Sequence, residues 1–146
     1  MTRRFKNLKG VCFTVAHIEE LRRYKRVHMI GIGGVSMSGI AEILKHWGFS
    51  ITGSDCAESE TTEKLKKDGI PIVIGHDVSL VSQADIVVYT AAIQKTDEEL
   101  VKAKELGIPT IERADFLGLL TKAFDDTICV SGTHGKTTTT SMISMC

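Results

Sequence analysis

The stretch Val27-His28-Met29-Ile30-Gly31-Ile32-Gly33-Gly34-Val35-Ser36 joins an apolar run to a glycine-rich turn and the start of an amphipathic segment. Apolar side chains then recur at helical spacing over Met37–Trp47, and Gly48 follows as a helix-ending residue. The order strand, glycine turn, helix is typical of the first unit of a parallel sheet with crossover helices. It predicts an α/β fold whose first strand is Val27–Ile32.

The same alternation of strand-like and helix-like segments continues downstream. We expect strands at Phe49–Thr52, Ile70–Ile74, Asp85–Tyr89 and Ile108–Ile111, and helices at Thr61–Asp68, from a capping box at Thr96–Glu99 to Leu106, and at Ala114–Ala123. His76–Ser82 reads as a turn. Pro109 cannot donate to a strand ladder, so its strand is expected near an edge of the sheet. These elements predict a Rossmann-like parallel sheet with flanking helices over residues 27–122.

A polar break at Phe124–Asp126 separates this predicted domain from the last part of the chain. Thr127–Val130 reads as one more strand, and a helix is expected from Thr137 onward. We therefore interpret residues 123–146 as the start of a second domain, with a strand, a loop and the beginning of a helix.

Composition excludes several classes of function. The chain of 146 residues is 42% hydrophobic and 25% charged, with a formal net charge of zero. Eight Lys/Arg and two Glu in residues 1–26 give +6, which leaves −6 for the rest, so the basic excess belongs to a short amino-terminal extension. Neither nucleic acid nor a membrane is the expected partner. The four cysteines show no metal-binding spacing, and no apolar run approaches the roughly 20 residues that span a bilayer.

The first glycine turn is a candidate phosphate-binding site. Glycines let backbone amides approach an anion at a helix amino terminus, where the helix dipole also attracts it. Ser36 stands where the dinucleotide fingerprint has its third glycine, so a tight turn without a ligand remains open. Asp55, at the end of the second predicted strand, is a candidate acceptor for a ribose hydroxyl, or else a turn cap.

The second candidate site is Ser131-Gly132-Thr133-His134-Gly135-Lys136-Thr137-Thr138. The Gly-Lys-Thr triplet is typical of loops that place amides around a β-phosphate, a lysine on the β/γ oxygens and a hydroxyl on Mg²⁺. Only two residues separate Gly132 from Gly135, where the usual motif has four, so a polar loop without nucleotide is the alternative. His134 is interpreted as a solvent-facing or phosphate-adjacent donor rather than a general base.

The two glycine loops depart from the generic motifs, and in the form found here both resemble loops of the Mur ligase family. Val27–Leu44 is similar to the opening of its muramate–alanine ligases, and Gly132–Thr140 is similar to its ATP loop. Three segments between them, Thr52–Asp55, Tyr89–Ile93 and Glu112–Asp115, also resemble the family. The resemblance covers Val27–Cys146.

The resemblance implies a ligase that joins L-alanine to UDP-N-acetylmuramate in peptidoglycan precursor synthesis. In that family the lactyl carboxylate takes the γ-phosphoryl group of ATP, and the alanine amine attacks the acyl phosphate. It assigns UDP-sugar binding to Gly31, Gly33, Gly34, Val35, Ser36, Asp55, Thr90, Ala91 and Ala92. It assigns ATP binding to Gly132, Thr133, His134, Gly135, Lys136, Thr137 and Thr138, with Lys136 catalytic and Thr137 on Mg²⁺. A cytoplasmic location is implied, and no ligase activity is expected of the 146-residue chain alone.

Three alternatives remain. A muropeptide-recycling ligase belongs to the same family, although the Gly33-Gly34 pair and Met37 fit the alanine-adding enzyme better. A NAD(P)-binding module of a dehydrogenase or regulatory protein accounts for Gly31, Gly33 and Asp55 and for nothing after Asp126. A non-catalytic nucleotide-sugar sensor is the third. Binding of UDP-N-acetylmuramate, UDP and NADH distinguishes them.

Overall fold

The computed structural model describes residues 21, 23–124 and 127–145. Most of the basic extension, residues 1–26, lies outside them. The strands are β1 (Arg26–Ile30), β2 (Ser50–Asp55), β3 (Ile72–Ile74), β4 (Ile86–Tyr89) and β5 (Thr110–Glu112). The helices are α2 (Val35–His46), α3 (Glu60–Lys67), α4 (Val78–Ser82), α5 (Glu98–Glu105), α6 (Arg113–Thr121) and α7 (Lys136–Ser144).

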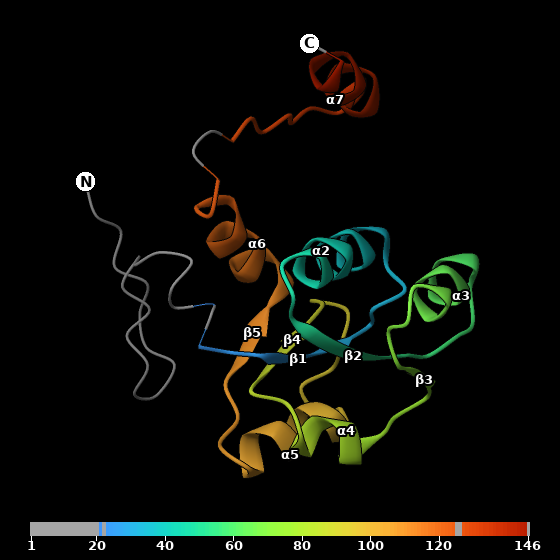
Figure 1. Cartoon of the computed structure of the whole chain (residues 1–146), viewed down its shortest axis with the longest axis vertical. Helices are drawn as coiled ribbons and strands as arrows, with labels where there is room; N and C mark the ends of the chain where they lie inside the picture. The colour runs from blue at the N-terminus through green and yellow to red at the C-terminus, as the bar shows by residue number, and fades with distance from the viewer. Residues whose placement is uncertain (1–20, 22, 125–126, 146) are drawn as a thin grey trace.

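The five strands form one parallel sheet in the order β3-β2-β1-β4-β5. Helices α2, α3 and α6 cover one face, and α4 and α5 cover the other (Figure 1). The chain changes direction along the sheet between β1 and β4, and in open sheets of this kind ligands bind outside the carboxyl ends of the strands at such a point. The predicted Rossmann-like fold is confirmed, and β5 is the edge strand expected from Pro109.

Alternate side chains of the central strands supply the two cores. Val27 and Met29 of β1 join α2 and α6 on one face, whereas Ile30 packs with Val87 of β4 and the helices α4 and α5 on the other. Because both faces are covered, β4 has the sequence Ile-Val-Val-Tyr and β1 is apolar at three of its five positions. His28 interrupts that pattern, and it is fully buried.

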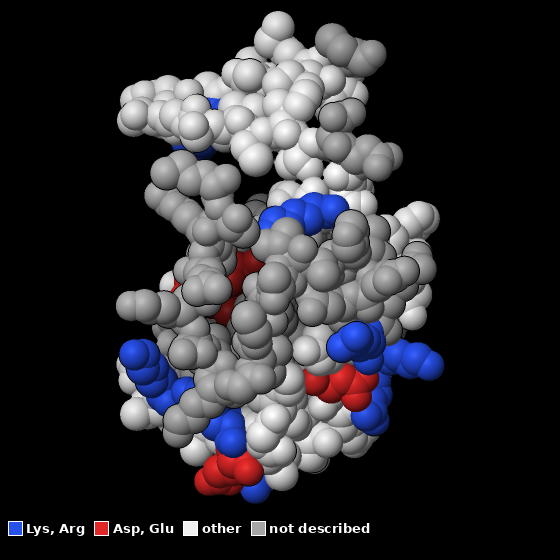
Figure 2. Space-filling model, turned by 90° about the vertical axis from the view of Figure 1, so that its left-hand side faces the viewer, with Lys and Arg blue, Asp and Glu red and all other residues white. Residues whose placement is uncertain are grey.

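Salt bridges on the surface mix both signs of charge. Arg26 donates to Asp85 at 2.7 Å and so links the amino ends of β1 and β4. The hydrogen bonds from Arg26, and two backbone amides, hold the pKa of Asp85 below its usual range although burial opposes this. In Figure 2, acidic and basic side chains lie beside one another over the lower part of the molecule, as expected for a chain without net charge. No described helix is long and apolar enough to cross a membrane.

Three local predictions were wrong. Part of the predicted turn His76–Ser82 is the short helix α4, which Asp77 caps by accepting from the Ser79 amide. Helix α5 is capped by Asp97 and not by Thr96, because Asp97 Oδ1 accepts from the amides of Glu99 and Leu100. The predicted strand Thr127–Val130 pairs with no other strand in the described chain, so it has no ladder to join.

Candidate functional site

The first glycine turn leaves the carboxyl end of β1 and enters α2. Its first two amides, those of Gly31 and Ile32, donate to the carbonyl oxygen of Ser54 at 2.8 and 3.1 Å. Backbone hydrogen bonds to the neighbouring strand β2 therefore hold the turn in place without a ligand.

Gly33 is held by Asp55, which lies at the end of β2. The Gly33 amide donates to Asp55 Oδ2 at 2.7 Å. A Cβ atom at Gly33 would lie 2.8 Å from that same oxygen and 2.8 Å from Thr62 Cγ2 of α3, which is closer than side chains pack. The close approach of β2 and α3 thus explains why residue 33 is a glycine. Asp55 was predicted to bind a ribose hydroxyl, and one of its two carboxylate oxygens already accepts a hydrogen bond within the protein.

The outward-facing part of the turn lies at the first turn of α2. The Gly34 amide donates to the Gly31 carbonyl at 3.3 Å, whereas helix geometry leaves the amides of Val35 and Ser36 without intrahelical acceptors. Val35 is 88% exposed. The start of α2 is therefore the part of the turn where backbone amides have no intrahelical acceptor and the helix dipole favours an anion.

No local motif predicts a role for Arg113, although it lies in the segment Glu112–Asp115 that resembles the Mur ligase family. Its Nη1 donates to Ser36 Oγ at 2.9 Å, across 77 positions of the chain. Arg113 begins α6 directly after the edge strand β5, so the sheet brings a guanidinium to the start of α2. Only the three-dimensional fold makes this pairing visible, because the two residues share no local motif.

The predicted residues after β4 divide into two groups. Thr90 lies beside the glycine turn, since a Cβ atom at Gly31 would be 3.4 Å from Thr90 Cγ2. Ala91 and Ala92 are exposed in the following turn. Tyr89, which precedes them, has its pKa raised by burial and by the nearby carboxylates of Glu112 and Asp115.

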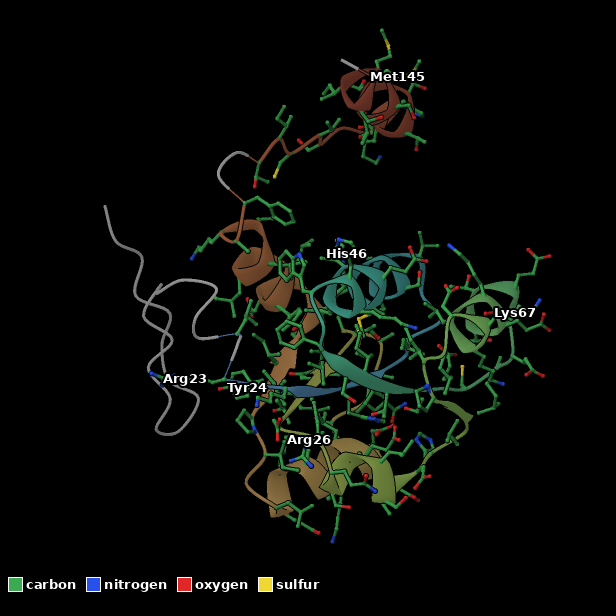
Figure 3. All side chains as sticks on the ribbon, in the orientation of Figure 1. Arg23, Tyr24, Arg26, His46, Lys67 and Met145 are labelled. Atoms are coloured by element: carbon green, nitrogen blue, oxygen red, sulfur yellow. The ribbon has the colours of Figure 1, made fainter. Side chains whose placement is uncertain are left out.

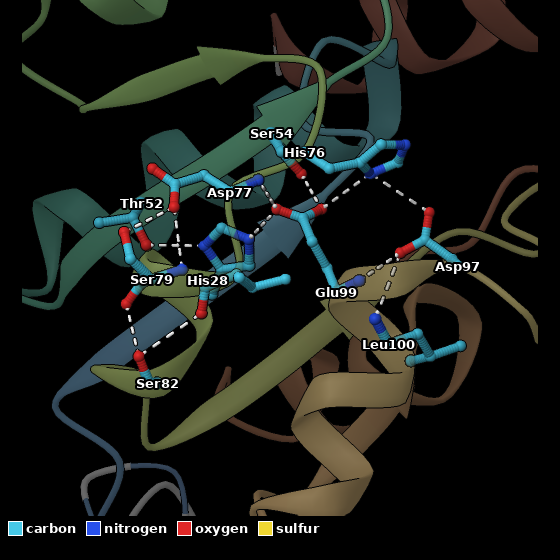
Figure 4. A network of polar contacts seen from close by, with 11 residues as sticks. His28, Thr52, Ser54, His76, Asp77, Ser79, Ser82, Asp97, Glu99 and Leu100 are labelled. Atoms are coloured by element: carbon cyan, nitrogen blue, oxygen red, sulfur yellow. Dashed lines mark hydrogen bonds and ion pairs between the residues drawn. The ribbon is translucent and has the colours of Figure 1, made fainter.

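Buried polar side chains form a network that extends from His28 of β1 toward the carboxyl ends of the strands, where the first glycine turn lies (Figure 4). His28 Nδ1 lies 2.9 Å from Thr52 Oγ1, and its Nε2 lies 3.4 Å from Glu99 Oε1. Burial by itself would raise the pKa of Glu99, but His28, Ser54 and the Asp77 amide together hold it below its usual range. The sequence signal was a histidine inside an otherwise apolar strand, and it was not used.

The second glycine loop is more open. Residues 131–145 are exposed, and α7 has no buried residue. Lys136 Nζ donates to the carbonyl oxygens of Gly132 at 2.6 Å and Thr133 at 3.4 Å, so the ammonium group is folded over its own loop. Gly135 and Thr137 stand at the start of α7, with Thr133, His134 and Thr138 around them.

Comparisons with known proteins agree on one family. Residues 26–125 match the model of the "Mur ligase family, catalytic domain". The chain is 56% identical over 123 residues to a UDP-N-acetylmuramate–L-alanine ligase of Acetivibrio thermocellus, and 58% identical over 120 residues to one of Clostridium botulinum strain Hall. These alignments cover 84% and 82% of this chain but 26% of each relative, so the chain spans about a quarter of their length.

Solved structures of the same kind have the same fold. The UDP-N-acetylmuramate-alanine ligase of Thermotoga maritima superposes with a TM-score of 0.77 at 34% identity, over 82% of this chain and 28% of that one. A murein peptide ligase of Psychrobacter arcticus superposes with a TM-score of 0.75 at 28% identity, over 82% of this chain and 25% of that one. The fold is thus common to ligases of different substrate specificity.

Proposed function

The chain belongs to the Mur ligase family, and from this premise we propose that it provides the UDP-sugar-binding region and the ATP loop of a ligase that joins L-alanine to UDP-N-acetylmuramate. The relatives at 56% and 58% identity carry that name, which favours alanine addition over muropeptide recycling. Because the chain spans about a quarter of those relatives, the reaction is proposed for a protein of their full length. We propose a cytoplasmic location for that protein.

The observation that carries the proposal is the arrangement at the start of α2. The amides of Val35 and Ser36 stand at the positive end of a helix of 12 residues, and Arg113 donates to the Ser36 hydroxyl. A diphosphate binds such a combination well, because helix amides and a guanidinium both donate hydrogen bonds to phosphate oxygens. Arg113 is accordingly proposed as a diphosphate-binding residue in addition to the predicted set.

The remaining predicted residues have defined parts in this proposal. Asp55 keeps Oδ1 for a ribose hydroxyl, since that oxygen has only long contacts, 3.4 Å to the Ala57 amide and 3.5 Å to Cys56 Sγ. Thr90 lies beside Gly31 and borders the same site, with Ala91 and Ala92 next to it. The glycines Gly31, Gly33 and Gly34 shape the turn more than they donate to the ligand.

The residue types of the second loop are suitable for binding ATP and Mg²⁺. Lys136 already donates to two loop carbonyls, positions that phosphate oxygens would take over, and Thr137 places a hydroxyl at the exposed first turn of α7. Mg²⁺, when bound, neutralises charge on the phosphates of the nucleotide. We propose that Lys136 orients the γ-phosphoryl group and stabilises the charge that develops on it.

Calorimetric titration of the 146-residue chain with UDP-N-acetylmuramate, UDP and NADH tests the proposal. We expect the nucleotide sugar to bind more tightly than UDP, and NADH least tightly. Arg113→Ala should weaken the binding of UDP-N-acetylmuramate and of UDP by roughly tenfold or more, as expected for hydrogen bonds to a charged group. Arg26→Ala is the matched control, because Arg26 is at the amino end of β1 and pairs with Asp85, so this variant should bind normally.

Two results would contradict the proposal. Preferential binding of NADH would support the dehydrogenase-like alternative. Equal weakening by Arg113→Ala and Arg26→Ala would show that the guanidinium beside Ser36 has no special part in binding the diphosphate.

A further inference from the structure

Three side chains that the proposed function does not use meet beyond the carboxyl ends of β3 and β4. His76 Nδ1 lies 3.5 Å from Asp97 Oδ2 and 3.7 Å from Glu99 Oε2 (Figure 4). The three atoms all lie within 4.8 Å of one another. The His76 side chain is 51% exposed, Asp97 9% and Glu99 0%, so the group runs from solvent into the protein.

The spacing of these atoms suits a shared ion. The distances from His76 exceed those of good hydrogen bonds. Imidazole nitrogen and carboxylate oxygen bind Zn²⁺ at about 2.0–2.2 Å, and tetrahedral ligands at that radius are roughly 3.3–3.6 Å apart. Both distances measured from His76 are close to this separation.

Each carboxylate is held in place by its other contacts. Asp97 uses Oδ1 to cap α5, which leaves Oδ2 directed at His76. Glu99 accepts from the Asp77 amide at 3.0 Å through Oε1 and from Ser54 Oγ at 2.5 Å through Oε2. A carboxylate oxygen has a second lone pair, so Oε2 can accept from Ser54 and still bind an ion. Supporting hydrogen bonds of this kind are typical of metal ligands.

Positive charge beside the two carboxylates of the group comes from histidines alone among the described ion pairs. Within the described residues, the ion-pair partners of Asp97 and Glu99 are histidines, with no lysine or arginine among them. His28 Nε2 is fully buried, lies 3.4 Å from Glu99 and has no hydrogen-bond partner in the described chain. A buried carboxylate pays a large desolvation cost unless positive charge compensates it. Hydrogen bonds from Ser54 and the Asp77 amide already help to keep Glu99 ionised, and a cation between His76, Asp97 and Glu99 would add a full positive charge to the two carboxylates.

We propose that His76, Asp97 and Glu99 bind a divalent transition-metal ion such as Zn²⁺, with water completing its coordination. One nitrogen and two carboxylate oxygens favour such an ion over Mg²⁺, which prefers oxygen ligands alone. The site is distinct from the Mg²⁺ position assigned to Thr137. It connects to the first glycine turn through Ser54, whose hydroxyl donates to Glu99 and whose carbonyl accepts from Gly31 and Ile32. Metal binding should therefore stiffen the turn.

Titration of the metal-free chain with Co²⁺ alone tests the site. Co²⁺ replaces Zn²⁺ and absorbs visible light when bound by few ligands, and a thiolate ligand adds a separate charge-transfer band. We expect ligand-field bands without the thiolate band. His76→Ala and Asp97→Asn should each weaken Co²⁺ binding by roughly tenfold or more. Asn is itself a good helix cap, so Asp97→Asn should leave α5 intact.

His46→Ala is the matched control, because His46 is also an exposed histidine but ends α2. It should bind Co²⁺ like the unchanged chain. Zn²⁺ should raise the melting temperature of the unchanged chain and of His46→Ala, with EDTA reversing the effect. The proposal is overturned if bound Co²⁺ shows the thiolate band, if no bands appear, or if His76→Ala and His46→Ala behave alike. None of these readouts involves a nucleotide, so they are independent of the proposed ligase function.

Discussion

The two glycine loops of this chain begin helices in the same way but are supported very differently. The first is tied to β2 through Ser54 and Asp55, and its helix α2 buries Met37, Ile40 and Leu44. The second makes its described contacts within itself, from Lys136 to loop carbonyls and from Thr140 to Lys136. In Figure 3, side chains fill the space between α2 and the sheet, whereas Met145 at the end of α7 points into open space. A phosphate-loop motif therefore determines a local turn, and neighbouring strands determine how rigidly it is held.

Removing a large buried side chain should give the largest difference between the two regions. Phe116 of α6 is fully buried against the sheet, so Phe116→Ala should lower the free energy of unfolding by about 3–5 kcal/mol. Ile143 of α7 is 38% exposed, and Ile143→Ala should change it by less than about 0.5 kcal/mol. Urea denaturation followed by circular dichroism measures both. Similar losses in the two variants would mean that α7 belongs to the same cooperative unit.

Much of the supported region was predictable from local pattern. Apolar runs that lead into glycine or aspartate located β1 and β2, an unbroken apolar run located β4, and helical spacing located α2, because those elements are long or strongly patterned. Helix α4 has five residues, too few for a clear period. The capping box failed because Asp97 competes with Thr96 for the cap and Glu99 turns inward to Ser54 and His28. Such contacts, 45 and 71 positions away along the chain, leave no local trace.

In the candidate site too, residues in continuous motifs were predictable, and residues that only the fold brings together were not. The glycine turns and Asp55 could be predicted as site residues because each lies in or beside a continuous motif, and Asp55 does contact the first turn. The roles of its groups were not predictable, since its bond to Gly33 depends on how closely β2 approaches the turn. Arg113 and the group His76, Asp97 and Glu99 were missed because the strand order, not the spacing, brings them together.

A methyl group added to the first turn should reveal how closely its neighbours hold it. Gly33→Ala places a Cβ atom 2.8 Å from Asp55 Oδ2 and Thr62 Cγ2, so we expect a loss of about 1–3 kcal/mol in the free energy of unfolding. Gly39→Ala is the control, because Gly39 lies inside α2 with nothing within 4 Å of an added Cβ atom. That variant should gain about 0.5–1 kcal/mol from helix propensity. Equal effects of both changes on thermal or urea denaturation would contradict the close packing of the turn.

The smallest expected effect is tested at two glycines that share a positive φ but border helices with different support. Gly107, after α5, and Gly135, before α7, have φ values of +70° and +78°, and an added Cβ atom at either would meet nothing within 4 Å. The local strain of alanine at positive φ is about 1–2 kcal/mol in both places. Gly107→Ala should transmit a cost of about 1 kcal/mol to global unfolding, because α5 is packed on the sheet through Leu100 and Ala103. Gly135→Ala should leave the melting temperature unchanged, since the strain then falls on a helix that buries no residue. If Gly135→Ala destabilised the sheet as much as Gly107→Ala does, the second loop would have to be folded against the five-stranded sheet and its helices.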